Sequence, residues 1–211
     1  MSADLVAELT AARVLAIIRG TDADAAAAAG KALLAEGVRL VEVSLTTPGA
    51  LGAIEAIRLD APDGTLVGAG TVLSVSDVAD VAAAGAQFVV TPAVVESIPE
   101  AARRGLPVAA GALTPTEAHT AVRMGASAVK LFPASLGGPA YLKALRDPFP
   151  HIPFVAVGGI GLDRMHAYFE AGAIAVGLGG PLVGDAASGG SLDNLRTRVR
   201  ACLAALRQGP A

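Results

Sequence analysis

Arg104-Gly105-Leu106 lies between two similar triplets, Ala84-Gly85-Ala86 and Met124-Gly125-Ala126, and the three glycines are 20 residues apart. Each triplet follows a helix-like stretch and precedes a short apolar run. A glycine just past a helix supplies the left-handed residue after which the chain can enter a strand. The stretch therefore predicts a repeating unit of one helix and one strand.

The same context occurs further out in both directions, at Glu36-Gly37-Val38 and Ala171-Gly172-Ala173. Gaps of 48 and 47 residues separate these outer glycines from the inner three, and each gap has room for two units. The period is therefore 20 to 24 residues, the length of one strand plus one helix.

Eight short runs are predicted strands, and most are continuously apolar, as expected where a parallel sheet is buried on both faces. They are Val14–Arg19, Leu40–Ser44, Leu66–Gly68, Gln87–Val90, Pro107–Ala109, Ala126–Phe132, Phe154–Val157 and Ala173–Leu178. The predicted helices between them are Asp22–Ala35, Gly49–Arg58, Val75–Ala84, Val94–Arg103, Pro115–Met124, Pro139–Arg146 and Leu162–Ala171. A leading helix, Ser2–Ala12, and a closing helix, Leu192–Arg207, complete the pattern.

Helix starts are marked by capping residues at Thr21/Asp22, Ser74 and Thr114-Pro115. Eight alternating units close into a (β/α)8 TIM barrel more naturally than into an open sheet. We expect residues 1–211 to form one such domain with an extra N-terminal helix. A doubly wound sheet is the alternative, but the sequence has no nucleotide-binding loop: neither G-x-G-x-x-G after the first strand nor G-x-x-x-x-G-K-[ST] occurs.

Composition excludes several classes of function. The net charge is -3, so no nucleic-acid surface is expected, and the longest uncharged stretches are too short to cross a membrane. The N-terminus has acidic residues early and no signal-peptide core, which predicts a cytoplasmic protein. One cysteine, Cys202, cannot form an internal disulfide, and the three histidines lack metal-ligand spacing, so we expect no metal and no cofactor.

Polar residues at the carboxyl ends of the strands mark the expected site, because TIM barrels carry their active sites there. Lys130 lies in the apolar run Ala128-Val129-Lys130-Leu131-Phe132-Pro133. Burial among aliphatic side chains favours a neutral amine, and a neutral amine attacks carbonyl groups. The alternative is a surface lysine, or one paired with a buried carboxylate.

Glu42 alternates with Val41 and Val43, so one of these two sets points into the barrel. A buried carboxyl opposite a lysine forms either a structural ion pair or a proton shuttle whose pKa is raised by burial. The glycine pairs Gly158-Gly159 and Gly179-Gly180 follow the last two strands, where bare backbone N–H groups suit a phosphate.

Five motifs in this order resemble the class I 2-keto-3-deoxy-6-phosphogluconate (KDPG) and 4-hydroxy-2-oxoglutarate (KHG) aldolases, including the 6-phosphogalactonate aldolases. The motifs are Val41-Glu42-Val43, Gly68-Ala69-Gly70-Thr71-Val72, Val90-Thr91-Pro92, Lys130-Leu131-Phe132-Pro133 and Gly158-Gly159-Ile160. The resemblance covers nearly the whole chain. It implies a metal-independent lyase that acts as a homotrimer and cleaves a phosphorylated keto sugar acid to pyruvate and D-glyceraldehyde 3-phosphate.

By this resemblance Lys130 forms an imine with the substrate and Glu42 transfers protons. The implied substrate-binding residues are Arg19 and Thr71 at the carboxylate end, the four glycines at the phosphate end, and also Pro92 and Phe132. In the gluconate branch an arginine follows the second strand, where this sequence has Thr46. Ile18-Arg19-Gly20 and the run from Gly138 to Leu145 look more like the galactonate branch.

Three rival functions remain open from the sequence. A 4-hydroxy-2-oxoglutarate aldolase would use the same lysine. A phosphate-binding isomerase or epimerase would need an acid–base pair but no nucleophilic amine, and a catalytically silent sugar-phosphate binding protein would need only the glycines.

Overall fold

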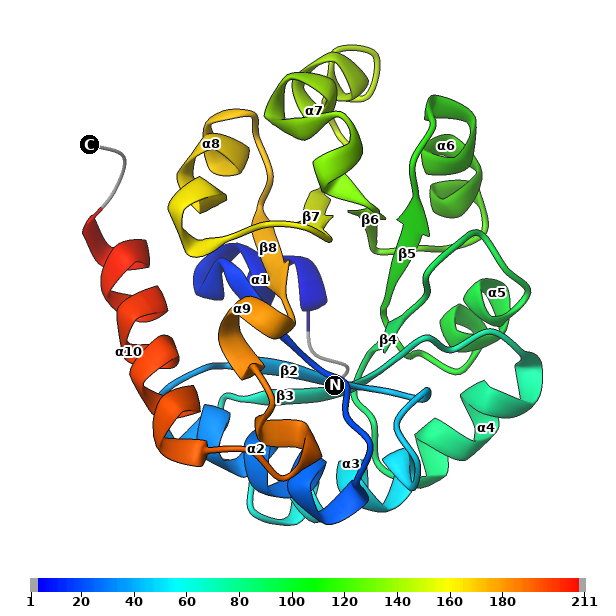
Figure 1. The fold of residues 1–211 in the computed structure, drawn as a ribbon. Coiled ribbons are helices and arrows are strands. Elements are labelled where there is room, and N and C mark those ends of the chain that lie inside the picture. The colour runs from blue at the N-terminus through cyan, green and yellow to red at the C-terminus, as the bar shows by residue number, and fades with distance from the viewer. Residues whose placement is uncertain (1–3, 209–211) are drawn as a thin grey trace.

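The computed structural model describes residues 4–208, and within them eight parallel strands close into a barrel. Neighbouring strands follow chain order, and the last pairs with the first to complete the ring. Most of the helices surround the strands on the outside, whereas the first helix, Leu5–Ala12, lies across one end of the barrel (Figure 1). The predicted (β/α)8 TIM barrel is therefore confirmed.

The strands are β1 Val14–Ile18, β2 Leu40–Ser44, β3 Leu66–Gly70, β4 Val89–Val90, β5 Val108–Ala112, β6 Ala128–Leu131, β7 Phe154–Val157 and β8 Ala175–Leu178. The α-helices are α1 Leu5–Ala12, α2 Ala23–Ala35, α3 Ala50–Leu59, α4 Val75–Ala83, α5 Ser97–Arg103, α6 Pro115–Arg123, α7 Gly138–Arg146, α8 Met165–Glu170, α9 Gly180–Val183 and α10 Leu192–Gln208. Short 3-10 helices are η1 Ala134–Leu136, η2 Leu162–Arg164 and η3 Ala186–Ser188.

The predicted helix ends are confirmed by their backbone geometry. All five repeat glycines have positive φ, between 74° at Gly105 and 102° at Gly125. This left-handed conformation ends each helix and lets the chain turn into the next strand. At the other ends, Asp22 caps α2, and Ser74 and Thr114 each form a reciprocal capping box with a carboxylate three residues later.

Several boundaries differ from the prediction. β3 continues beyond Gly68 to Gly70 because Val43 and Ser44 of β2 remain paired with its last two residues, although glycine alone favours no strand. β4 is only two residues long, and α5 begins at Ser97 rather than Val94. The predicted helix over Leu162–Ala171 divides into η2 and α8, and η1, η3 and α9 were not predicted. Ser2, where the leading helix was predicted to begin, lies outside the described residues.

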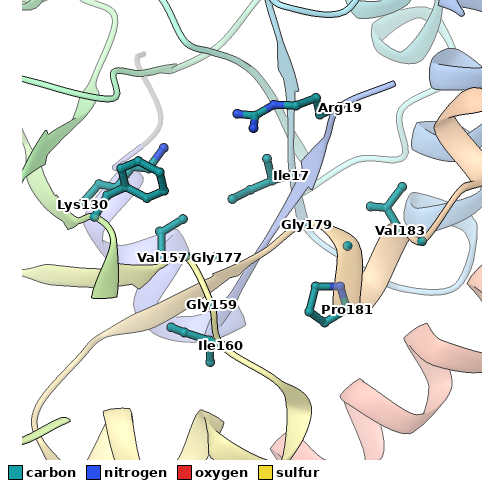
Figure 2. A pocket seen from close by; sticks show the side chains of 14 residues that line it. Ile17, Arg19, Lys130, Val157, Gly159, Ile160, Gly177, Gly179, Pro181 and Val183 are labelled. Atoms are coloured by element: carbon teal, nitrogen blue, oxygen red, sulfur yellow. The ribbon is translucent and has the colours of Figure 1, made fainter. Parts of the chain in front are cut away.

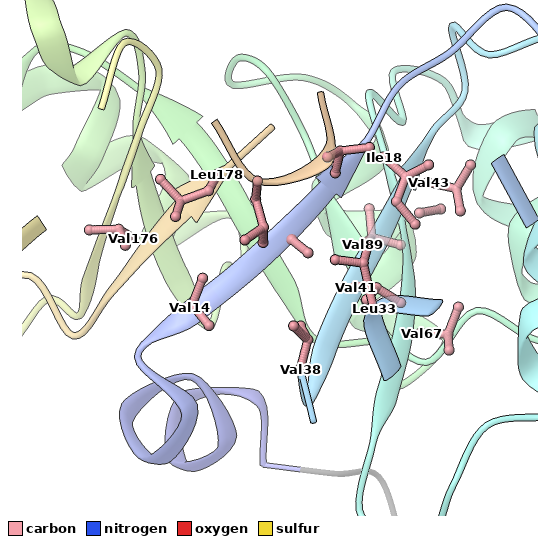
Figure 3. Close-up of a cluster of buried hydrophobic side chains, with 14 of the residues drawn as sticks. Val14, Ile18, Leu33, Val38, Val41, Val43, Val67, Val89, Val176 and Leu178 are labelled. Carbon is pink, nitrogen blue, oxygen red and sulfur yellow. The ribbon is translucent and has the colours of Figure 1, made fainter. Parts of the chain in front are cut away.

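Two apolar layers lie on opposite faces of the sheet. The outer layer, between strands and helices, contains Val41, Val43 and Val67 packed near Leu33 of α2 (Figure 3). The inner layer fills most of the barrel interior, and its members are Leu15, Leu40, Leu66, Phe88, Val90, Ala109, Ala128, Val155, Val157 and Ala175. Apolar burial on both faces explains why the strands lack polar alternation in the sequence.

Helix α1 closes the amino-terminal end of the barrel. Its buried Leu5 and Leu9 belong to the inner layer, and Asp4 caps the helix by accepting hydrogen bonds from Val6 and Ala7 N–H. The amino-terminal end of the barrel interior is therefore filled by side chains, and open space inside the barrel lies toward the carboxyl ends of the strands. None of the helices within residues 4–208 is long and apolar enough to cross a membrane.

Candidate active site

Side-chain alternation directs Glu42 and Lys130 into the barrel. Leu40 of β2 and Ala128 of β6 belong to the inner layer, and the two polar residues follow them by two positions. Successive residues of a strand point to opposite faces, so Glu42 and Lys130 lie inside, above the apolar layer. The sequence left open whether Glu42 or its two valine neighbours face the barrel interior. In the structure Glu42 does, and Val41 and Val43 face the helices.

Glycines on neighbouring strands leave room for these inward groups. A Cβ atom at Gly70 would lie only 2.6 Å from Glu42 Oε1, and one at Gly68 would lie 2.5 Å from the Phe88 ring. At Gly111, the ladder neighbour of Lys130, a Cβ would collide with the backbone of Pro92. These glycines therefore leave space near the carboxyl ends of the strands, and that space is occupied by the Glu42 side chain, the Phe88 ring and the backbone of Pro92.

Lys130 is buried, with 6% of its surface exposed. In the sheet it pairs with Gly111 on one side and Val155 on the other. Its Nζ lies 5.0 Å from the centroid of the Phe132 ring, which itself remains 37% exposed at the barrel mouth. The amine therefore stands between an apolar wall and an aromatic side chain that a ligand can reach.

Glu42 is 2% exposed, and its Oε2 is buried without a hydrogen-bond partner among residues 4–208. Burial raises the pKa of this carboxyl above its ordinary value, while the positive charges of Lys130 and Arg19 act in the opposite direction. A carboxyl that keeps its proton more readily than usual, and interacts electrostatically with a buried amine, is suited to proton transfer.

A cavity of 360 Å³ opens beside Lys130 at the carboxyl ends of β1, β6, β7 and β8. Its walls are Ile17, Arg19, Lys130, Phe132, Val157, Gly158, Gly159, Ile160, Gly177, Gly179, Gly180, Pro181, Val183 and Gly184. Figure 2 shows the nitrogen ends of Arg19 and Lys130 pointing into the same space, with Gly159, Gly179 and Pro181 on the opposite side. The cavity therefore offers two nitrogen groups at one end and backbone at the other.

The backbone end of the cavity consists of two strand-to-helix turns. Gly158 and Gly159 have φ values of 97° and 71°, a conformation that residues with a Cβ adopt only with strain. Gly179 precedes α9, where Pro181 has no N–H, so the glycines supply the backbone donors at that turn. A Cβ at Gly179 would meet only Ile17, at 3.6 Å and beyond, so the space next to it opens into the cavity.

Most of the sequence-predicted site residues meet at this cavity: Arg19, Lys130, Phe132, Gly158, Gly159, Gly179 and Gly180. Glu42, Thr71 and Pro92 do not line it. Glu42 interacts electrostatically with Lys130 and Arg19, which do line the cavity. The backbone of Pro92 packs against Gly111. Thr71 lies at the end of β3, where its hydroxyl is 2.9 Å from that of Ser44.

Ile17, Gly177 and Pro181 line the cavity but were not predicted. Ile17 and Gly177 each follow an inward-facing residue, Leu15 or Ala175, by two positions on the same strand, so they also face inward. The sequence could not indicate this, because it does not show which residues of these strands face inward. Pro181 belongs to α9, which is too short for its sequence pattern to reveal.

Comparison with known proteins gives one consistent family. Residues 5–195 match the model of the KDPG and KHG aldolase family. A 2-dehydro-3-deoxy-6-phosphogalactonate aldolase from Escherichia coli (strain K12) is 40% identical over 80% of this chain and 83% of its own length. A 2-dehydro-3-deoxy-phosphogluconate aldolase from Treponema pallidum (strain Nichols) is 39% identical over 74% of this chain and 75% of its own.

A solved structure of similar fold carries a trapped reaction step. It is a KDPG aldolase from Legionella pneumophila with pyruvate captured as a covalent carbinolamine intermediate, and it is 31% identical to this chain. The two folds agree with a TM-score of 0.82 over 95% of this chain and 97% of that one. Since the family model spans all eight strands and these relatives match most of the barrel, the chain belongs to the KDPG and KHG aldolase family.

Proposed function

We propose that this protein is a class I aldolase that cleaves a 2-keto-3-deoxy-6-phospho sugar acid to pyruvate and D-glyceraldehyde 3-phosphate through an imine on Lys130. The single observation that carries the proposal is a buried lysine inside the barrel that borders an open cavity and interacts with a buried carboxyl. Lysine is rarely buried without a partner or a chemical role. The carbinolamine in the Legionella relative supports the same chemistry here.

The reaction begins when the Lys130 amine, after it releases its ammonium proton to solvent, adds to the C2 ketone of the substrate. Protonation of its hydroxyl group allows the resulting carbinolamine to lose water and become an iminium ion. Glu42, directly or through a water molecule, takes the proton of the C4 hydroxyl, and the C3–C4 bond breaks with its electron pair moving into the iminium. Glyceraldehyde 3-phosphate leaves, the enamine is protonated at C3, and hydrolysis of the imine releases pyruvate and the free amine.

The ends of the substrate have different partners. Arg19 and Thr71 hold the carboxylate end, and the glycine backbone of Gly158-Gly159 and Gly179-Gly180 holds the phosphate. Bare N–H groups at strand-to-helix turns are well suited to an anion, because nothing prevents close approach. Pro92 and Phe132 shape the apolar walls around the reacting carbons.

The preferred C4 epimer is of the galactonate type in this proposal. Thr46 occupies the position where the gluconate branch has an arginine, and the relatives include aldolases of both names. Steady-state cleavage of the two C4 epimers, with 4-hydroxy-2-oxoglutarate as a third substrate, tests this choice. A higher kcat/KM for the gluconate epimer would refute the galactonate assignment without affecting the imine chemistry.

The assembly is a homotrimer of single-domain chains, residues 1–211, and the protein acts in the cytoplasm. Exposed apolar side chains in the loops after β3 and β6, Leu73 and Leu136, support association, since a lone barrel would leave them in water. Light scattering at micromolar concentration tests the trimer, and a monomer mass would contradict it.

Borohydride trapping tests the imine. Reduction in the presence of pyruvate should attach a stable three-carbon adduct to the peptide that contains Lys130. Lys130→Arg should abolish both turnover and labelling, because a guanidinium stays charged and does not attack carbonyls. Labelling of Lys31 or Lys143 instead, or of no lysine, would contradict the mechanism.

A further inference from the structure

Ser44 is a fully buried polar residue that the proposed mechanism leaves unused. It is the last residue of β2, shares the inward parity of Leu40 and Glu42, and has 0% of its surface exposed. Its Oγ lies 2.9 Å from Thr71 Oγ1 and 2.8 Å from Thr46 Oγ1. A hydroxyl has one proton to donate and can also accept, so Ser44 can link both threonines at once.

Thr71 adopts a backbone conformation that needs such support. Its φ is +61°, in the left-handed region that β-branched residues rarely occupy. The chain is fixed on either side, because Gly70 O accepts a hydrogen bond from Leu45 N–H and Val72 N–H donates to Val90 O. The bond to Ser44 then fixes the side chain as well. Residues that surrounding contacts hold in a strained backbone conformation are concentrated at functional sites.

We propose that Ser44 is a positioning residue, which holds the Thr71 hydroxyl in the direction needed to bind the substrate carboxylate. This inference rests on the proposed function, in which Thr71 binds that carboxylate. Ser44 itself acts only through Thr71. Thr46, on the exposed side, is the second partner of Ser44, and either hydroxyl of that pair can be the donor.

The consequence is a change in binding rather than in chemistry. Without the Ser44 hydroxyl, Thr71 loses its anchor, and its side chain rotates among other rotamers or bonds to water. Ser44→Ala should therefore raise KM for the sugar acid, and for pyruvate in C3 proton exchange, by about five- to tenfold, the scale of one ordinary hydrogen bond. The value of kcat should change less than threefold or so, because Lys130 and Glu42 keep their places.

A double-mutant cycle with Thr71→Val separates positioning from a merely structural role. Thr71→Val keeps the β-branched shape and removes the hydroxyl. If Ser44 acts through Thr71, the double variant Ser44→Ala/Thr71→Val should have the same KM as Thr71→Val alone. If the two KM increases multiply, or if Ser44→Ala leaves KM unchanged, the inference is wrong.

Matched variants complete the experiment. Thr46→Val removes the other hydrogen-bond partner of Ser44 and should raise KM less than twofold or so. Ser44→Thr keeps a hydroxyl at position 44 and should therefore have the wild-type KM. Thermal unfolding of each variant verifies that the fold is intact, and Ser44→Cys replaces Ser44→Ala if the latter does not fold. Pyruvate trapping on Lys130 in the same samples tests the proposed function separately. Trapping with an unaltered KM in Thr71→Val would overturn the role of Ser44 and leave the aldolase chemistry in place.

Discussion

Gly70→Ala is predicted to impair catalysis by moving Glu42 while leaving the barrel folded. The new Cβ would lie 2.6 Å from Glu42 Oε1 and 2.9 Å from its Cδ, whereas ordinary contacts begin at 3.4 Å. The φ at Gly70 is not positive, so alanine fits the backbone. The carboxyl end of Glu42 is the part that can yield, because it terminates a flexible side chain.

The required displacement follows from those distances. Glu42 Oε1 must move by about 0.8 Å to reach ordinary contact with the new methyl group. Misplacing a catalytic group by about 1 Å can cost about 100-fold in rate. We therefore expect kcat for cleavage to fall by roughly 10- to 100-fold, while trapping of pyruvate on Lys130 continues at near the wild-type extent.

Gly68→Ala on the same strand is the matched control. Its Cβ would lie 2.5 Å from the ring of Phe88, which is fully buried, and its three nearest contacts are all with that ring, so the steric strain of this variant falls first on the core. Overpacking typically costs about 1–3 kcal/mol of stability. Gly68→Ala should therefore lower the melting temperature more than Gly70→Ala and preserve kcat per folded molecule. Wild-type kcat in Gly70→Ala, or losses that merely follow stability in both variants, would refute the reasoning.

Three further predictions concern other groups of the site and core. Glu42→Gln should lower kcat by roughly 10²–10⁴-fold. Because burial raises the Glu42 pKa, wild-type kcat should fall as pH decreases, with a midpoint above the usual range of a glutamate carboxyl, and this acidic limb should be absent from the variant. Normal pyruvate C3 proton exchange in Glu42→Gln would exclude Glu42 as the shuttle. Gly179→Val should weaken phosphorylated substrates strongly and spare pyruvate trapping, since the side chain enters the cavity; equal losses in the two assays would count against phosphate binding there. Cys202 is buried, which raises its thiol pKa to about 11, so a thiol reagent at neutral pH should modify it only after unfolding; rapid modification of the folded protein would contradict this.

The barrel could be predicted from the sequence because its signals are local. A glycine with positive φ ends each of five helices, and capping residues such as Ser74 and Thr114 begin others, each through contacts within a few residues. Lys130 and Glu42 could be chosen as candidates for a similar reason: each is a charged residue inside a short apolar run. Family resemblance then supplied roles for the residues around them.

The direction of the side chains required the closed barrel. Strands buried on both faces are apolar at every position, so periodicity could not say whether Glu42 or its valine neighbours faced inward. Closure of the sheet decided it, because the inner layer admits only residues with the parity of Leu40. The same closure revealed Ile17 and Gly177 as cavity walls.

The sequence by itself therefore determined the order and type of most elements, the family, and the two charged residues of the proposed chemistry. Tertiary structure alone decided that Gly70 makes room for Glu42 and that Ser44 bonds to Thr71, 27 residues away in the chain. The physical reason is range. Helix caps and turns depend on neighbours in sequence, whereas a carboxyl against a glycine or one hydroxyl against another depends on the register between strands, which exists only in the folded barrel.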